Sequence, residues 1–279
     1  MTRKIVVFGA GGFVGQAISN GLKSGGHSVL DLARNDVDLL DERSFEKIQQ
    51  MVNDGDIAVL AFARAPARSL EDIFENMLMM QNALKFLKNR NLSYVLNISS
   101  DAVYSDSKEP LNEHSMMAPI SAHGIMHCLR ERLVDHTFCN SAGHLRPTLI
   151  FGKDDPHNGY GPNSFWRKIM AGEDIILFGK GEEMRDHIHI TDVASIAIEM
   201  IKKQYLGAIN AATGQLRSFH GIANSMVTLR NAKCKVLTSQ RHGPMPHDGY
   251  RAFDNSAVRR LLPDIKFMTI ENFLLSEST

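Results

Sequence analysis

A glycine-rich stretch near the start of the chain, residues 3–15, constrains the fold more than any other feature of the sequence. It reads Arg-Lys-Ile-Val-Val-Phe-Gly-Ala-Gly-Gly-Phe-Val-Gly. The unbroken apolar run at residues 5–8 is typical of a parallel strand buried on both faces, and helical periodicity follows the glycines. Glycine tolerates positive φ and close backbone approach, while the amides at a helix N-terminus attract a pyrophosphate. The stretch therefore predicts strand, tight turn and helix around a nucleotide, although glycine-rich turns also occur in other α/β proteins. The predicted cofactor contacts are Gly9, Gly12, Phe13, Val14 and Gly15.

The overall charge argues against nucleic-acid and membrane partners. Lys plus Arg and Asp plus Glu number 31 each among 279 residues, so no net charge attracts a polyanion. Neither a cationic leader nor an apolar run of transmembrane length is apparent. Cys128, Cys139 and Cys234 are widely spaced and fit reduced thiols better than a disulfide framework. We therefore expect a cytoplasmic protein that binds neither nucleic acid nor a membrane.

The first half of the chain alternates short apolar runs with longer segments of helical periodicity. This alternation is the signature of βαβ units, whose right-handed crossovers assemble a doubly wound parallel α/β sheet. The predicted strands are 3–8, 28–33, 57–62, 93–98 and 143–146. The predicted helices are 13–24, 43–52, 71–89 and 120–138.

The pattern changes after residue 151, where turn-forming residues predict a long loop over 152–163. Beyond this loop we expect a helix near 164–171, a short strand near 175–178 and a helix near 191–203. The predicted division is a dinucleotide-binding domain of residues 1–162, rejoined by 185–212, and a smaller substrate lobe of residues 163–184 and 213–279. The ligand cleft is expected between the two.

The second predicted strand bears on the choice of dinucleotide. A carboxylate at its end bonds the ribose hydroxyls and repels a 2′-phosphate, whereas an arginine attracts one. The carboxylate position holds Ala33 and is followed by Arg34, while Asp31 stands two residues earlier. We therefore predict NADP(H), with NAD(H) left open. Asp38 and Leu39 are predicted to lie near the adenine, with a solvated loop carboxylate as the alternative interpretation of Asp38.

Two further strand ends carry candidate site residues. Small residues in Ala61-Phe62-Ala63, after the third strand, let the backbone approach the cofactor. The fourth strand ends in Ser99-Ser100, and ligands of such sheets bind at the carboxyl ends of the strands. Serines there also suit a turn or a helix cap, which is the alternative interpretation.

Together with Ala102-Val103-Tyr104, these motifs resemble the extended short-chain dehydrogenase/reductases and, more narrowly, their nucleotide-sugar epimerase/dehydratase/reductase group. The resemblance continues through Leu145-Arg146-Pro147, Phe151-Gly152, Gly161-Pro162-Asn163, Phe178-Gly179-Lys180-Gly181, residues 185–194 and Gly207-Ala208-Ile209-Asn210. It implies a Rossmann-type fold with a smaller C-terminal lobe. It also implies an NAD(P)-dependent oxidoreductase or epimerase that acts on a nucleotide-activated sugar.

The chain departs from this family at the catalytic helix. The family uses a Tyr-x-x-x-Lys pair, in which the tyrosine is the acid/base and the lysine holds the nicotinamide ribose and lowers the tyrosine pKa. Alignment on Pro119 and Glu131 puts His123 at the tyrosine position and His127 at the lysine position. A spacing of four keeps both histidines on one face of the helix.

Two histidines are chemically able to take over these roles. His123 is the predicted acid/base, while a neutral His127 still hydrogen-bonds a ribose hydroxyl but supplies no fixed charge. Ser100 is predicted to orient the substrate oxygen. The two histidines lack an obvious third ligand, so no metal is predicted. An acid/base role for Asp101 or Tyr104 stays open.

The resemblance also implies residues on the substrate side. Arg185 matches the arginine that binds the diphosphate, for which a bidentate guanidinium is suited, and Asn163 matches an asparagine that contacts the diphosphate-sugar. A structural ion pair between Arg185 and the neighbouring Asp186 is the alternative interpretation. Arg146, in the Leu-Arg-Pro motif, is the third predicted substrate contact.

Within the group we favour a ketoreductase that makes a single hydride transfer over a 4-epimerase. The chain is short for the group, and Arg34 suits the cofactor of net reductions. The alternative is an NADP(H)-binding sensor, or a lapsed enzyme, that does not turn over. Relatives often dimerise through two helices, which here correspond to residues 71–89 and 120–138.

Overall fold

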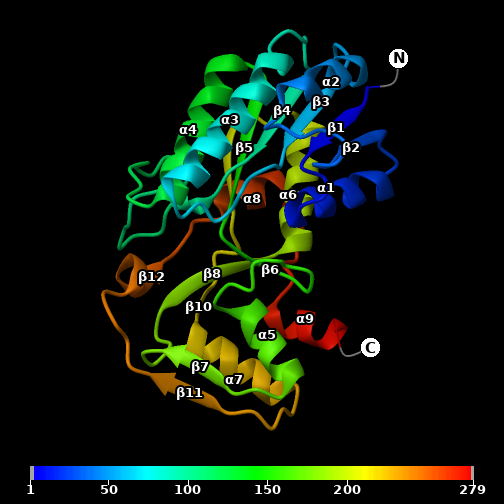
Figure 1. The fold of residues 1–279 in the computed structure, drawn as a ribbon. Helices are drawn as coiled ribbons and strands as arrows, with labels where there is room; N and C mark the ends of the chain where they lie inside the picture. The colour runs from blue at the N-terminus through cyan, green and yellow to red at the C-terminus, as the bar shows by residue number, and fades with distance from the viewer. Residues whose placement is uncertain (1–2, 278–279) are drawn as a thin grey trace.

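The computed structural model describes residues 3–277, in a larger α/β domain and a smaller lobe (Figure 1). Six strands within these residues form one sheet in the order β2-β1-β3-β4-β5-β9, and every neighbouring pair is parallel. Their bounds are β1 (Ile5–Phe8), β2 (Val29–Leu32), β3 (Ile57–Leu60), β4 (Tyr94–Ile98), β5 (Ala142–Pro147) and β9 (Gly207–Ala211). The predicted doubly wound parallel sheet is confirmed, because the chain crosses back from β2 past β1 to β3.

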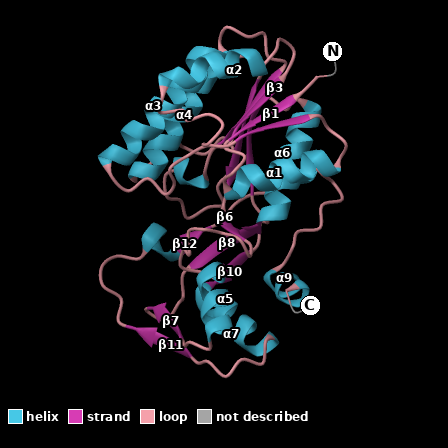
Figure 2. Ribbon diagram, turned by 45° about the vertical axis from the view of Figure 1, so that its right-hand side comes forward, coloured by secondary structure: helices cyan, strands magenta, loops and turns pink. Residues whose placement is uncertain are grey.

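Helices cover both faces of this sheet (Figure 2). One face carries α2 (Phe45–Met51), α3 (Leu70–Leu87) and α4 (Ala122–Thr137), and the other carries α1 (Phe13–Ser24), α6 (Ile190–Lys203) and α8 (Ser256–Leu261). The start of α4 is set by Ser121, whose hydroxyl accepts from the amide of Gly124, so the helix begins two residues later than predicted. Among the helices of residues 3–277, none is long and apolar enough to cross a membrane.

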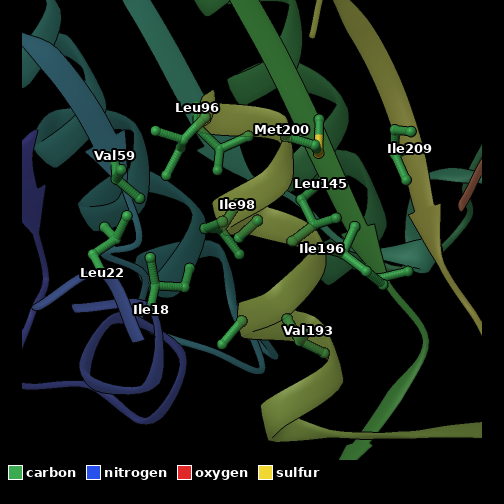
Figure 3. Close-up of a cluster of buried hydrophobic side chains, with 14 of the residues drawn as sticks. Ile18, Leu22, Val59, Leu96, Ile98, Leu145, Val193, Ile196, Met200 and Ile209 are labelled. Carbon is green, nitrogen blue, oxygen red and sulfur yellow. The ribbon is translucent and has the colours of Figure 1, made fainter. Parts of the chain in front are cut away.

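The larger hydrophobic core lies between the sheet and the layer of α1 and α6 (Figure 3). Apolar side chains of the central strands meet a stripe of α6 whose residues recur every three or four positions, as an amphipathic helix requires. The labelled side chains of this core are Ile18, Leu22, Val59, Leu96, Ile98, Leu145, Val193, Ile196, Met200 and Ile209. Each fully buried aliphatic side chain of this kind stabilises the fold by about 1.5–3 kcal/mol.

The smaller lobe contains a second sheet, in which β8 (Met184–His189) is the central strand. It pairs with β6 (Leu149–Phe151), β10 (Leu216–Ser218) and β12 (Tyr250–Arg251). A two-stranded sheet of β7 (Ile175–Phe178) and β11 (Val236–Ser239) lies further out. The helices of this lobe are α5 (Pro162–Ala171), α7 (Phe219–Leu229) and α9 (Ile270–Ser276).

The division between domain and lobe differs from the predicted one. β6 and residues 185–189 pair with each other in the smaller sheet, although the sequence assigns both to the dinucleotide-binding domain. The opposite holds for α8, because Ala257, Val258 and Leu261 are buried in the core of the larger domain. The chain therefore crosses between the two parts more often than its sequence pattern indicates.

Candidate active site

The predicted glycine turn follows β1, where the strand order reverses between β1 and β3. Gly9 has a φ of +84°, and a Cβ on it would lie 2.7 Å from the backbone nitrogen of Phe62, so only glycine fits. Gly12 precedes α1 without a side-chain cap, and no acidic residue stands in the first turn. The amides of this turn are therefore suited to a pyrophosphate. Gly15 has a different role: it lets α1 pack closely on the turn, because a Cβ there would lie 2.2 Å from the carbonyl oxygen of Gly9.

A cavity of about 400 Å³ lies beside this turn. It is lined by the predicted residues Gly9, Gly12, Arg34, Asp38, Leu39, Ala61, Phe62 and Ala63. Arg34 is 75% exposed in its side chain, and its Nε lies 3.6 Å from Asp38 Oδ2. Asp31 does not line this cavity, since its carboxylate accepts from Ser19 Oγ (2.5 Å) and pairs with Lys23. Of the two candidates at the end of β2, only Arg34 reaches the cavity.

A second cavity, of about 610 Å³, forms a cleft between the sheet and the smaller lobe. Its lining includes the predicted residues Phe13, Val14, Ser100, His123, His127, Asn163 and Arg185. Ser100 lies two residues beyond the end of β4 and caps the short 3₁₀ helix η2 (Asp101–Val103). Its Oγ accepts from the amide of Ala102 (3.2 Å) and donates to Asp101 Oδ1 (3.3 Å). The cleft thus brings together residues that lie far apart in the sequence.

His123 lies in the first turn of α4. Its Nδ1 accepts a hydrogen bond of 3.4 Å from the amide of Ala67, so the neutral ring carries its proton on Nε2. Burial lowers the pKa of His123 below 6.5; the carboxylate of Asp101 opposes this, while His157 and Arg130 add to it. At neutral pH this ring is therefore an uncharged hydrogen-bond donor.

His127 lies one turn further along α4 and is 4% exposed. Burial holds its pKa well below 6.5, and the charges of His123 and Arg130 act in the same direction. Its Nδ1 has no hydrogen-bond partner among the described residues. Nδ1 is enclosed by the protein, but the ring lines the wall of the cleft that adjoins the glycine turn, where a neutral imidazole suits a hydrogen bond to a ribose hydroxyl. In residues 3–277, no group of three or more His, Cys, Asp or Glu is arranged to hold a metal.

The side-chain amide of Asn163 is engaged within the protein. Its Nδ2 donates to Asp155 Oδ2 (2.6 Å) and to the carbonyl oxygen of Ile150 (3.3 Å), while its Oδ1 accepts from the amide of Gly152 (3.0 Å). Asn163 therefore holds the loop that borders the cleft, and a ligand reaches its polar atoms only by displacing one of these partners.

Arg185 lines the cleft but is 5% exposed. Its Nη2 donates to the carbonyl oxygen of Pro246 (2.6 Å) and to Glu183 Oε2 (3.1 Å), and its Nη1 donates to the carbonyl oxygen of Met184 (3.0 Å). Burial lowers its pKa from the ordinary arginine value, which the carboxylate of Glu183 opposes. The guanidinium of Arg185 thus lies where a diphosphate is expected, but Nη1 and Nη2 already donate hydrogen bonds within the protein.

The structure does not bring Arg146, a predicted substrate contact, to the cleft. Its guanidinium forms a bidentate pair with Glu131 (Nε–Oε1 2.9 Å, Nη2–Oε2 2.6 Å), and its Nη1 donates to the hydroxyl of Tyr104 (2.6 Å). Arg146 is 4% exposed, does not line the cleft and connects β5 to α4.

Tyr104 does not line the cleft either; burial raises its pKa to about 12, and its hydroxyl donates to Asn210. Tyr104 is therefore not placed to act as an acid/base in the cleft.

Residues 5–212 match the NAD dependent epimerase/dehydratase family. The chain belongs to this family. GDP-L-fucose synthase of Escherichia coli strain K12 is 22% identical to it, over 84% of each chain. UDP-glucose 4-epimerase from Thermotoga maritima, solved with UDP-glucose, matches the fold with a TM-score of 0.86 at 19% identity, over 97% of this chain and 96% of its own. UDP-glucuronic acid 4-epimerase from Bacillus cereus, in complex with UDP-glucuronic acid and NAD, matches with a TM-score of 0.82 at 17% identity, over 98% and 97%. The predicted family of nucleotide-sugar epimerases, dehydratases and reductases is confirmed.

His247 and Arg251 line the cleft, which the sequence did not predict. Arg251 of β12 is 3% exposed and donates from Nε to Asp101 Oδ2 (3.1 Å) and from Nη1 to Asp106 Oδ1 (3.1 Å). His247, in the 3₁₀ helix η3 (Pro246–Gly249), contacts Asp106 and lines the cleft. The sequence of this segment, rich in Pro, Gly and His, has no periodicity that would have placed it there.

Proposed function

We propose that the protein is an NADP(H)-dependent ketoreductase that reduces the keto group of a nucleotide-activated sugar. The observation that carries this proposal is the state of His123. A neutral ring with its proton on Nε2 lies in the cleft with Ser100, next to the glycine turn. Such a ring offers a hydrogen bond to an oxygen, whereas abstraction of a proton would need the lone pair on Nε2 that this tautomer lacks.

The proposed mechanism assigns one role to each residue. The bound dinucleotide supplies the hydride that adds to the keto carbon. Ser100 and His123 Nε2 hydrogen-bond the keto oxygen and stabilise the negative charge that develops on it. Protonation of His123 Nδ1 from solvent, which breaks the bond from the Ala67 amide, makes the ring an acid; it then transfers its Nε2 proton to that oxygen, which leaves a neutral ring with its proton on Nδ1 and a hydroxyl product. His127, which lines the cleft, holds a ribose hydroxyl through its neutral ring.

The preference for NADP(H) over NAD(H) rests on the end of β2. Arg34 reaches the smaller cavity, while Asp31 is held by Ser19 and Lys23 on the α1 side. Arginine attracts a 2′-phosphate, and a carboxylate at that position would repel it. Related structures were solved with NAD, so this chain would differ from them in its cofactor.

The proposed substrate is a nucleoside-diphosphate sugar, as in the relatives named above. Arg185 is the proposed diphosphate contact, because it is the guanidinium that the smaller lobe brings to the cleft from β8. Binding would exchange its bond to the carbonyl oxygen of Pro246 for a charge-assisted bond to phosphate.

One observation favours the second candidate, an NADP(H)-binding sensor that does not turn over. The polar groups of Asn163 and most of the donors of Arg185 are satisfied within the protein. With these contacts made, the cofactor half of the site is formed while the diphosphate half is closed.

Calorimetry separates the two candidates. NADPH and NADH are titrated separately, and then UDP, GDP and dTDP are titrated into the NADPH complex. A ketoreductase is expected to bind NADPH more tightly than NADH and to prefer one diphosphate. NADPH binding with no diphosphate binding would support the sensor, and absence of both dinucleotides would contradict both candidates.

We also propose a homodimer formed through α3 and α4, which lie side by side (Figures 1 and 2). Leu70, Phe74 and Leu78 form an exposed stripe at a spacing of four on α3, and Ile125 and Leu129 form another on α4. Two copies of such a surface would bury each other's apolar side chains about a two-fold axis. Sedimentation equilibrium of the wild type and of Phe74→Glu tests this proposal, with a dimer expected for the first and a monomer for the second.

A further inference from the structure

Arg130 is a buried cation on the same helical stripe as the two active-site histidines. His123, His127 and Arg130 stand at positions i, i+4 and i+7 of α4. Arg130 is 0% exposed, and its one hydrogen bond among the described residues joins Nη2 to Asn97 Oδ1 at 3.5 Å. Its Nε and Nη1 have no partner in residues 3–277.

The surroundings of Arg130 do not neutralise its charge. The guanidinium carbon lies 4.7 Å from the centroid of the Phe62 ring, an apolar face that compensates a cation only in part. The carboxylate next in sequence, Glu131, is engaged by Arg146 and by the hydroxyl of Ser99. Burial lowers the pKa of Arg130 to about 9, so the side chain still carries its charge at neutral pH.

Phe62 connects this cation to the cofactor site. It lines both the smaller cavity and the cleft, and the guanidinium of Arg130 lies over its ring. Arg130 itself lines neither cavity, so it stands behind their wall. An unpaired buried charge destabilises a fold, and apolar residues of similar volume are often more stable in such places. A structural role alone therefore does not account for an arginine here.

We propose that Arg130 is a positioning residue that supplies, from behind the cleft, the fixed positive charge that His127 does not provide. Its field acts on His123 and His127 through the apolar interior, where charges are weakly screened. It adds to the burial that keeps His127 uncharged as a hydrogen-bonding group, and it makes the protonated His123 a stronger proton donor. This inference rests on the proposed function of His123 for its use in catalysis, but its electrostatic part is measurable without turnover.

The test is a titration of the cofactor-free protein by NMR with ¹³C-labelled histidine, in which His123→Gln assigns the His123 signal. The groups that act on His123 besides Arg130 are Asp101, His157 and His127, and they are unchanged in every variant compared. Arg130→Met removes the charge at similar length and is expected to raise the pKa of His123 by about one unit. Arg130→Lys keeps the charge and is expected to leave the pKa within a few tenths of a unit of the wild type. Arg132→Met, an exposed change on the same helix, is the matched control and should cause no shift.

An unchanged His123 pKa in Arg130→Met, or an equal rise in Arg130→Lys, would overturn the inference. Thermal unfolding separates it from a structural role, because Arg130→Met should melt at the same or a higher temperature than the wild type. If Arg130→Met does not fold, Arg130→Gln replaces it as the uncharged variant and is compared with Arg130→Lys in the same way. A shift in pKa without any measurable ketoreductase activity would leave the electrostatic role standing and count against the proposed function instead.

Discussion

The rings of His123 and His127 meet edge to face, with their centroids 4.6 Å apart and their planes at 86°. At this separation a proton on one ring opposes a proton on the other, and burial disfavours both. His127 is the more deeply buried of the two, and its pKa is the more strongly lowered. His123 is therefore the ring of the pair that takes up a proton first when the pH falls, which suits it to proton transfer and leaves His127 to bind.

Replacement of His123 tests this division of roles directly. His123→Phe is expected to lower kcat by about 10²–10⁴-fold, the usual contribution of a general acid, while the affinity for NADPH changes little. Steady-state kinetics and calorimetry measure the two quantities. His136→Phe, an exposed change on the same helix, is the control and should retain full activity. Turnover that survives in His123→Phe would transfer the acid/base role to Asp101, which lines the cleft but is paired with Arg251.

The pH profile of the reduction follows from the lowered pKa of His123. The protonated ring is the acid, so kcat/KM for the keto substrate should rise as the pH falls below 6.5 and level off below the pKa of His123. The folded state should lose stability as the pH falls below 6.5. In the unfolded chain these histidines take up a proton near pH 6.5, whereas in the folded protein their lowered pKa values delay protonation to lower pH. Rates are therefore compared only where circular dichroism reports a folded protein. A rate that rises with pH through this range would contradict the assignment.

Arg34 is expected to determine the choice between the two dinucleotides. Arg34→Ala removes the proposed contact to the 2′-phosphate and should weaken NADPH binding by about tenfold or more, with little effect on NADH, as for the loss of one charge-assisted hydrogen bond. Isothermal titration with both cofactors measures the ratio. Arg43→Ala removes another exposed arginine that pairs with an aspartate and should leave the ratio unchanged. Equal losses for the two cofactors would contradict a 2′-phosphate site at Arg34.

Much of the fold is predictable because it is encoded locally. The strands β1 and β3 are short apolar runs, and the glycine turn dictates its own backbone, as the φ of Gly9 shows. The assignment of segments to domain or lobe is not local. β8 reads like its neighbours in sequence but pairs with β10 and β12, and α8 is too short for its pattern to reveal that it packs on β9.

The same contrast holds within the candidate site. His123, His127 and Ser100 were predictable from motif spacing, since each lies at a fixed distance from a strand or helix end. Arg146 shows the limit of that reasoning, because a motif gives the position of an arginine but not the direction of its guanidinium, and here a buried glutamate holds it. Arg251 was unpredictable because contacts 145 and 150 residues apart in sequence bring it to the cleft.

The pair of Arg146 and Glu131 should therefore behave as a structural element. Both side chains are at most 5% exposed, and removal of one partner leaves an unpaired buried charge. Arg146→Met and Glu131→Met are each expected to lower the free energy of unfolding by about 3–5 kcal/mol, and the double variant Arg146→Met/Glu131→Met by less than the sum. Urea unfolding measures these values, and Lys85→Met, which breaks the exposed pair with Glu42, serves as the control with little expected change. The NADPH and diphosphate affinities of whatever fraction remains folded should match the wild type. A variant of Arg146 that is as stable as the wild type but binds the diphosphate more weakly would restore the substrate role that the geometry denies it.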